Sequence, residues 1–115
     1  MLNQVVEYQS GQLDVVYAAL AHPVRRTLLE HLRRGGAKVT DLAAPFRMSL
    51  AAVSKHIRVL ESAGLIQRTI RGREHQLVLE PSPLMSAADW LDSYRSFWEE
   101  RLDLLDAKLR SQRQR

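Results

Sequence analysis

The spacing of apolar residues changes abruptly at Gly64, and this change restricts the folds open to the chain. Before Gly64, apolar side chains recur every three or four residues, at Leu50, Val53, Ile57 and Leu60. That period predicts an amphipathic helix over Ser49–Ala63, with Ser49 as its N-cap and the glycine as its stop. After Gly64 the period falls to two, which predicts strands over 65–70 and 74–79. A helix followed at once by a β-hairpin is therefore the central unit of the chain.

Three helices are predicted before this unit. The first spans Leu13–Ala21 on helical spacing, and residues 1–12 are expected to be partly frayed. The second begins at Pro23, because proline suits a helix's first turn, and it ends at Gly35-Gly36. The third has Thr40 as its N-cap and is about two turns long, because a proline follows within a few residues.

A long helix is predicted after the hairpin, from about Leu84 to Leu109. Pro81-Ser82-Pro83 breaks the chain before it. Its leucines and aromatic residues follow the spacing of a coiled-coil seam, with a seam at Trp98, Leu102, Leu105 and Leu109. Together with Trp90, Leu91, Tyr94 and Phe97, they form a wider stripe than one small domain normally covers.

The order of these elements is that of a winged helix-turn-helix. The predicted fold class is mainly α with a small β-hairpin (α+β), in the order α-α-α-α-β-β-α. The 115 residues fit a single domain over 1–115. Within it we expect a core at 13–83 that includes a wing at 65–79, followed by a C-terminal helix at 84–110.

Basic residues concentrate in the middle of the chain. Residues 22–75 hold eleven Lys or Arg against four acids, a balance of +7. The rest holds six basic and nine acidic residues, a balance of −3, and the two sum to the net charge of +4. This distribution favours a polyanionic partner for the middle alone, although a solvated charged surface would look the same.

The predicted helix-turn-helix and its wing carry the candidate DNA-binding residues. The second helix of such a unit enters the major groove, where small and polar side chains reach base edges. Lys55 and Arg58 suit phosphate contacts, and the arginines of the tip Arg71-Gly72-Arg73 suit a narrow minor groove. The predicted residues are Ser49, Ala51, Ala52, Ser54, Lys55, His56, Arg58, Arg68, Arg71 and Arg73. An ordinary amphipathic helix and an ordinary charged hairpin remain the alternatives.

Other classes of function find little support in the sequence. The chain has no cysteine, which excludes disulfides, zinc–thiolate sites and thiol redox switches. Its histidines form no i, i+4 pair, so we predict no metal site and no cofactor. No phosphate loop or hydrolase motif is present, so we predict no catalytic residue and no enzyme. Without a recognisable signal peptide or membrane-spanning run, we expect a cytoplasmic, nucleoid-associated protein with no membrane partner.

Two segments of the chain resemble the arsenic-repressor (ArsR) family of regulators. The run at 21–29, AHPVRRTLL, resembles the opening motif of that family, and the run at 53–66, VSKHIRVLESAGLI, resembles its recognition signature nearly residue for residue. Residues 71–75 resemble its wing, and the resemblance covers about 13–79. It implies a sequence-specific DNA-binding regulator, a homodimeric repressor at a palindromic, inverted-repeat operator in double-stranded DNA.

The resemblance also implies that the first and last helices form the dimer interface, which agrees with the wide apolar stripe. The predicted interface residues are Leu13, Val16, Leu20, Trp90, Leu91, Tyr94, Trp98, Leu102 and Leu105. The alternative is that all of them pack inside one protomer.

The chain departs from the metal-sensing members of that family. Those members carry a run that resembles C-V-C-D-L. This chain has Lys38-Val39-Thr40-Asp41-Leu42 in its place, so both thiol ligands are missing. The last helix has acids but no histidine. The aromatic last helix resembles a metal-independent subgroup, and the metal-sensing role is not carried over.

Two alternatives stay open from the sequence. The repressor could respond to a small organic ligand at the aromatic dimer interface, and such an inducer is unknown. The winged helix could instead serve protein–protein contact, although such a module would not need so many basic residues near the predicted recognition helix and wing.

Overall fold

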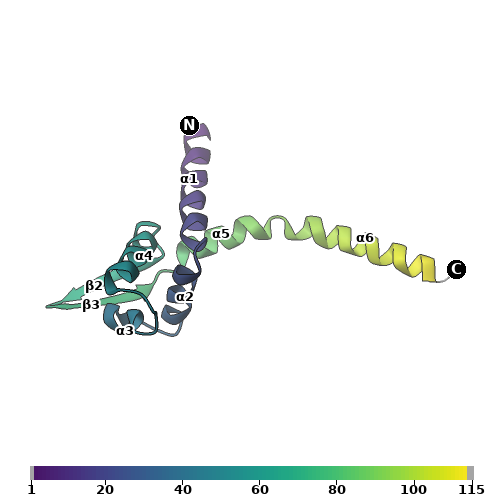
Figure 1. Ribbon diagram of the computed structural model, residues 1–115. Coiled ribbons are helices and arrows are strands. Elements are labelled where there is room, and N and C mark those ends of the chain that lie inside the picture. Colours follow the sequence, from purple (N-terminus) through teal and green to yellow (C-terminus); the bar gives the residue numbers. More distant parts are fainter. Residues whose placement is uncertain (1, 114–115) are drawn as a thin grey trace.

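The computed structural model describes residues 2–113 and has a mainly helical fold with a small antiparallel sheet (Figure 1). The helices are α1 (Leu2–Leu20), α2 (Pro23–Leu32), α3 (Val39–Ala43), α4 (Leu50–Ser62), α5 (Ser82–Asp92) and α6 (Arg95–Arg113). The strands are β1 (Ala37–Lys38), β2 (Ile66–Arg71) and β3 (Glu74–Leu79). The predicted fold class is confirmed, with a third strand and a divided last helix as additions.

One hydrophobic core fixes α4 in place. The helix turns Val53, Ile57 and Leu60 inward, and none of them is more than 1% exposed. They share one buried cluster with Leu28 of α2 and Leu77 of β3. Because burying each such side chain contributes about 1.5–3 kcal/mol, this stripe holds the helix firmly against α2 and the sheet.

Both ends of α4 are as the sequence predicts. The hydroxyl of Ser49 accepts a hydrogen bond from the backbone N–H of Ala52 at 3.1 Å, which caps the first turn. At the other end Gly64 has φ 74°, a left-handed conformation that glycine adopts without steric cost. The N–H of Leu65 then bonds to the carbonyl of Leu60, which closes a Schellman motif and directs the chain into β2.

The wing is the antiparallel β2–β3 hairpin. The first strand begins one residue later than predicted, and the second has the predicted bounds. Strand pairing runs from Ile66 opposite Leu79 to Arg71 opposite Glu74, so only two residues remain for the loop. The first of these, Gly72, has φ 63°, as the first central position of a II′ hairpin turn requires.

The sequence did not predict β1, because two residues carry no readable period. This strand pairs with the far side of β3, which gives the sheet the order β1-β3-β2. Gly36 permits the close approach of the two strands. A Cβ atom at Gly36 would lie 3.0 Å from Val78 Cγ1 and 3.2 Å from the Leu77 carbonyl oxygen.

Two predictions about the N-terminal helices were wrong. The first helix begins at Leu2 rather than Leu13, and the residues before Leu13 contain no proline that would interrupt it. Thr40 is not an N-cap: α3 begins at Val39, directly after the extended Lys38, which makes no side-chain cap bond. The third helix is correspondingly short and ends before Pro45.

The single helix predicted over 84–109 is two helices, so this prediction was also wrong. The hydroxyl of Ser93 donates to the Trp90 carbonyl at 2.6 Å. The N–H of Tyr94 donates to the carbonyl of Leu91, a three-residue step that tightens the turn and ends α5. The preceding Pro81-Ser82-Pro83 run does not keep the chain irregular, since α5 begins at Ser82 and takes Pro83 into its first turn.

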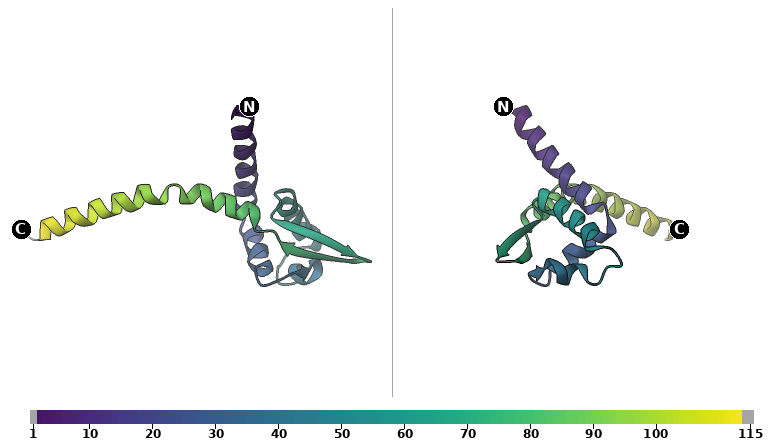
Figure 2. Two further views of the ribbon diagram at one scale, coloured as in Figure 1. Left: turned by 180° about the vertical axis from the view of Figure 1, so that it is seen from behind. Right: turned by 60° about the vertical axis from the view of Figure 1, so that its left-hand side comes forward.

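The last helix extends away from the rest of the molecule. In all three views α6 and the wing project from opposite sides of the core (Figures 1 and 2). The extents of the chain are 72 × 43 × 21 Å, and α6 has no buried residue.

Candidate nucleic-acid interface

The exposed side of α4 combines small and basic residues. Ala51, Lys55 and Arg58 are exposed and follow one another at spacings of four and three, away from the buried stripe. Ala52 and Ser54 flank them and are half-buried. Small side chains near the start of a helix allow its backbone to approach base edges closely. Long cationic side chains farther along the helix can contact the neighbouring phosphates. The DNA-contacting role of these residues stays a prediction.

Four of the predicted cations are exposed and form no ion pair within the described part of the chain. Among the side chains that the structure describes, Lys55, Arg58, Arg71 and Arg73 make no ion pair. Each is exposed. The exposed side of α4 and the wing tip therefore present cations that have no ion-pair partner, and such positive charge attracts a polyanion over a distance of about a Debye length.

Leu50 does not lie where the sequence pattern placed it. Its spacing assigned it to the buried face with Val53, yet 51% of it is exposed. Leu50 is the first residue of α4, and the helix start protrudes beyond the core that covers Val53. The neighbouring Met48 is exposed as well.

Arg68 is held inside the wing base rather than extended into solvent. Its guanidinium donates to both carboxylate oxygens of Glu61, at 2.6 and 3.2 Å, and to Nδ1 of His75 at 2.8 Å. The side chains of Arg68 and Glu61 are 23% and 28% exposed. This cluster joins the end of α4 to both wing strands, a role for Arg68 that the sequence pattern does not predict. The only indication of this ion pair in the sequence is the opposite charge of Glu61 and Arg68, seven residues apart.

His56 faces the start of α2. Its Nδ1 lies 3.2 Å from a terminal nitrogen of Arg25, and its ring lies 4.3 Å from that of His22. The same Arg25 donates to two carbonyls in the last turn of α1, those of Ala18 and Ala19. Burial, with the charges of His22 and Arg25 beside it, lowers the pKa of His56. His56 thus joins α4 to the helices behind it, and its predicted base contact stays a prediction.

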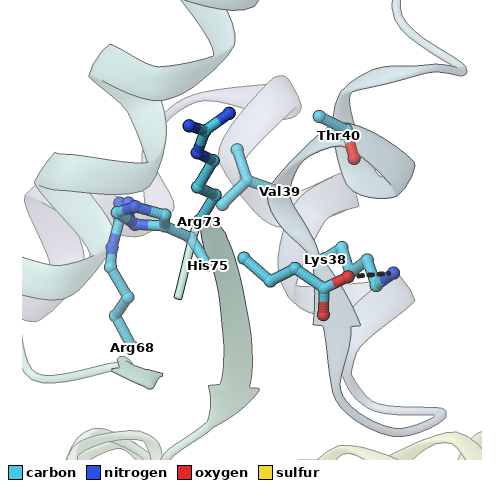
Figure 3. Close-up of a pocket in the computed structure, with 7 residues that line it drawn as sticks. Lys38, Val39, Thr40, Arg68, Arg73 and His75 are labelled. Atoms are coloured by element: carbon cyan, nitrogen blue, oxygen red, sulfur yellow. Dashed lines mark hydrogen bonds and ion pairs between the residues drawn. The ribbon is translucent and has the colours of Figure 1, made fainter. Parts of the chain in front are cut away.

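A shallow pocket separates the wing from the start of α3 (Figure 3). Arg68, Arg73 and His75 line it on the wing side, and Lys38 lines it on the other, bonded to Glu74 at 2.9 Å. The carboxylate of Glu74 raises the pKa of Lys38. This ion pair connects the wing to the strand that leads into α3.

The same segment provides no ligand set for a thiophilic metal. A lysine ammonium and a threonine stand where thiolates would be required, and Lys38 already has an anionic partner. Among the residues whose side chains the structure describes, no group of three or more potential ligand residues (His, Cys, Asp or Glu) lies close enough to hold a metal ion. Over residues 2–113, no helix is both long and apolar enough to cross a bilayer.

The predicted dimer residues divide into two groups. Val16 is 1% exposed and lies in the protomer's own core, so its assignment to an interface was wrong. Periodicity had identified an apolar face without showing which element covers it. Leu13 and Leu20 are half-buried against the same core. The remaining predicted residues are at least 45% exposed: Trp90, Leu91, Tyr94, Trp98, Leu102 and Leu105.

Aromatic residues link α1 to α5 and continue along α6. The hydroxyl of Tyr17 donates to the Ala87 carbonyl at 2.7 Å, and its ring meets Trp90 edge-on. Trp90 meets Tyr94 in turn, and Tyr94 stacks on Trp98 at 6.3 Å. This row crosses the break between α5 and α6 and keeps their apolar faces continuous.

Comparison with known proteins gives a consistent set of relatives. A helix-turn-helix domain model matches residues 20–69. The chain is 34% identical over 89 residues to the HTH-type transcriptional regulator Rv2034 of Mycobacterium tuberculosis, covering 77% of this chain and 80% of that protein. It is 28% identical to the transcriptional repressor SdpR of Bacillus subtilis, over 69% and 88% of the two chains. The crystal structure of an ArsR family transcriptional regulator matches with a TM-score of 0.74 and 39% identity, over 78% of this chain and 93% of that one.

Proposed function

This chain belongs to the ArsR family of winged helix-turn-helix regulators and is a DNA-binding transcriptional regulator, and we propose that it represses transcription as a homodimer on an inverted-repeat operator. The observation that carries the proposal is the exposed side of α4 with its unpaired Lys55 and Arg58, next to a wing tip with two more unpaired arginines. A protein–protein module would have no need to keep these cations unpaired.

In the proposed complex, α4 lies in the major groove. Ala51, Ala52 and Ser54 approach base edges, since small side chains allow the backbone close to the bases. Lys55 and Arg58 contact flanking phosphates and fix the position of the helix. The wing tip reaches the adjacent minor groove, where negative potential attracts arginine.

The exposed apolar face of α5 and α6 supports the dimer. Phe97, Trp98, Leu102, Leu104, Leu105 and Leu109 on α6 are between 46% and 65% exposed. A soluble monomer rarely leaves a contiguous stripe of this kind in water, because burying each large side chain contributes about 1.5–3 kcal/mol. A second copy offers a matching stripe, and two-fold symmetry then presents two recognition helices to the two halves of an inverted repeat.

Metal sensing is not part of the proposal. The residues at the family's thiolate positions, Lys38 and Thr40, do not suit a thiophilic cation. Addition or removal of Zn²⁺ is therefore expected to leave operator affinity unchanged, and this is measurable in the same titrations as DNA binding.

Footprinting of the purified protein on the DNA upstream of its own gene tests the proposal. We expect protection of two half-sites about 10 base pairs apart centre to centre, and affinity at least about a thousandfold above random duplex. Affinity should fall steeply with salt. If dimeric protein binds no duplex at low salt, the proposal is wrong and the protein–protein module becomes the better interpretation.

A second candidate function is control by a small organic effector. A pocket of ≈ 330 Å³ lies between α1 and α5, with an apolar wall at Leu13, Pro83 and Trp90 and a polar rim that includes Gln12, Ser86 and Asp89. With Trp98→Phe, Trp90 becomes the only tryptophan, and its fluorescence reports ligand entry. An effector that changes this fluorescence should also change operator affinity. A panel of aromatic and aliphatic compounds that changes neither would rule the candidate out.

A further inference from the structure

The start of the recognition helix carries an apolar tip. Leu50 is the first residue of α4 and is 51% exposed, Ala51 beside it is exposed, and Met48 lies just before the cap residue. The surface behind this tip is basic and polar, with Lys55 and Arg58 one and two turns farther along the helix. A ligand that matches this surface would combine an apolar group for Leu50 with negative charge for the cations behind it.

The core does not explain Leu50. Val53, the next apolar residue on the helix, is completely buried, and Ile57 and Leu60 continue the buried stripe. The cap of the helix is made by the Ser49 hydroxyl and needs no side chain from Leu50. The exposed part of Leu50 therefore contributes neither to the packing of α4 nor to its N-cap.

The DNA major groove offers one apolar group that matches such a tip. Thymine carries a C5-methyl group there, whereas the edges of the other bases present only hydrogen-bond donors and acceptors beside their ring carbons. The first residues of a recognition helix are those that come nearest to the bases. The unpaired cations behind the tip favour DNA over an apolar protein surface as the occupant.

We propose that Leu50, supported by Ala51, is a specificity-determining residue that recognises a thymine methyl group in each operator half-site. This inference rests on the proposed function, because it requires α4 to enter the major groove. It adds to that function the identity of one recognised base, thymine. It also adds a DNA-contacting residue, Leu50, that the periodicity had assigned to the core.

Removal of the methyl group from the DNA tests the inference directly. The operator is first obtained by selection from random duplexes with the full-length protein. Each thymine is then replaced by uracil, which keeps every hydrogen-bonding group and lacks only the methyl. For the unmodified protein we expect one position per half-site where uracil weakens binding about fourfold, and about fifteen-fold when both half-sites are changed.

The variant Leu50→Ala should bind the thymine operator more weakly by a similar factor and should no longer distinguish thymine from uracil at that position. Leu50→Met keeps an apolar side chain of similar size and should keep the discrimination, so it preserves the test if the alanine variant folds poorly. Val59→Ala is the matched control, since Val59 is an exposed apolar residue at the far end of α4. Its uracil profile should equal that of the unmodified protein.

The possible failures are distinct. If no duplex is selected and none is bound at low salt, the proposed function fails and this inference fails with it. If an operator is selected but the uracil profiles of the unmodified protein and Leu50→Ala coincide, DNA binding stands and the role of Leu50 is overturned.

Discussion

The helix α4 and the C-terminal helices α5 and α6 keep their apolar side chains in opposite places. In α4 three large apolar residues are almost completely buried within the protomer, and the exposed side is small, polar and basic. In α6 no residue is buried, and six large apolar residues lie in solvent. The buried stripe holds α4 against its own protomer, whereas no described residue of the protomer covers the apolar side chains of α6, which are those of the proposed dimer interface.

The largest expected effect comes from the core under α4. Leu60→Ala removes a fully buried side chain, so the free energy of unfolding should fall by about 2–5 kcal/mol. Chemical denaturation measures the change. Leu109→Ala removes the same atoms from an exposed site on α6, and in protein too dilute to dimerise it should cost about 0.5 kcal/mol or less. Equal losses in the two variants would contradict the contrast between the two regions.

The next effect comes from the stripe on α6. Leu102→Asp places a carboxylate in the proposed interface, where burial without a partner costs about 2 kcal/mol or more and weakens the dimer at least about thirtyfold. Sedimentation at several protein concentrations measures the association. Ala107→Asp adds the same charge to the opposite side of the helix and should leave the dimer intact. A dimer that tolerates Leu102→Asp would show that its interface lies elsewhere.

A smaller effect is expected from single cations on the exposed side of α4. Lys55→Ala removes one phosphate contact per protomer, so the salt dependence of binding should fall by about two phosphates per dimer. Operator and random duplex should be weakened alike, since phosphate contacts carry no sequence information. Lys108→Ala changes the net charge equally on α6 and serves as the control. Loss of preference for the operator in Lys55→Ala would mean that Lys55 contacts a base instead.

The smallest effect concerns His56, which joins α4 to the start of α2. Burial and the charges of His22 and Arg25 hold its folded pKa below the ordinary value of about 6.5. Between the two pKa values, His56 is therefore protonated in the unfolded chain and neutral in the folded protein. The stability linked to this group is complete above about pH 6.5 and is lost as the pH falls through the lower folded pKa. His56→Gln should flatten the decline in unfolding free energy on the acidic side, and an unchanged decline would exclude His56 as its source.

Features with a local cause could be predicted from the sequence. Ser49 caps α4 because its own hydroxyl reaches a backbone N–H three residues on. Gly64 stops the helix because it adopts a left-handed conformation easily, and Gly72 forms the hairpin turn for the same reason. Such signals lie within a few residues of the structure that they determine.

Features that depend on distant parts of the chain could not be predicted. Leu50 has the right period for the core, but period gives only the direction of a side chain and not how far the core extends beneath it. The break after Asp92 lies in a run without glycine or proline, so the apolar pattern continues across it. Arg68 finds Glu61 only after the helix and the hairpin have folded together.

The three bonds of Arg25 couple two motions that would otherwise be independent. A guanidinium is rigid and planar, so few orientations serve the Ala18 and Ala19 carbonyls and His56 at once. A displacement of the end of α1 relative to α4 would therefore break at least one of these bonds. In the proposed dimer, the angle between subunits and the spacing of the two recognition helices would then change together. The half-site spacing that the protein accepts on DNA would then depend on Arg25, a residue of α2.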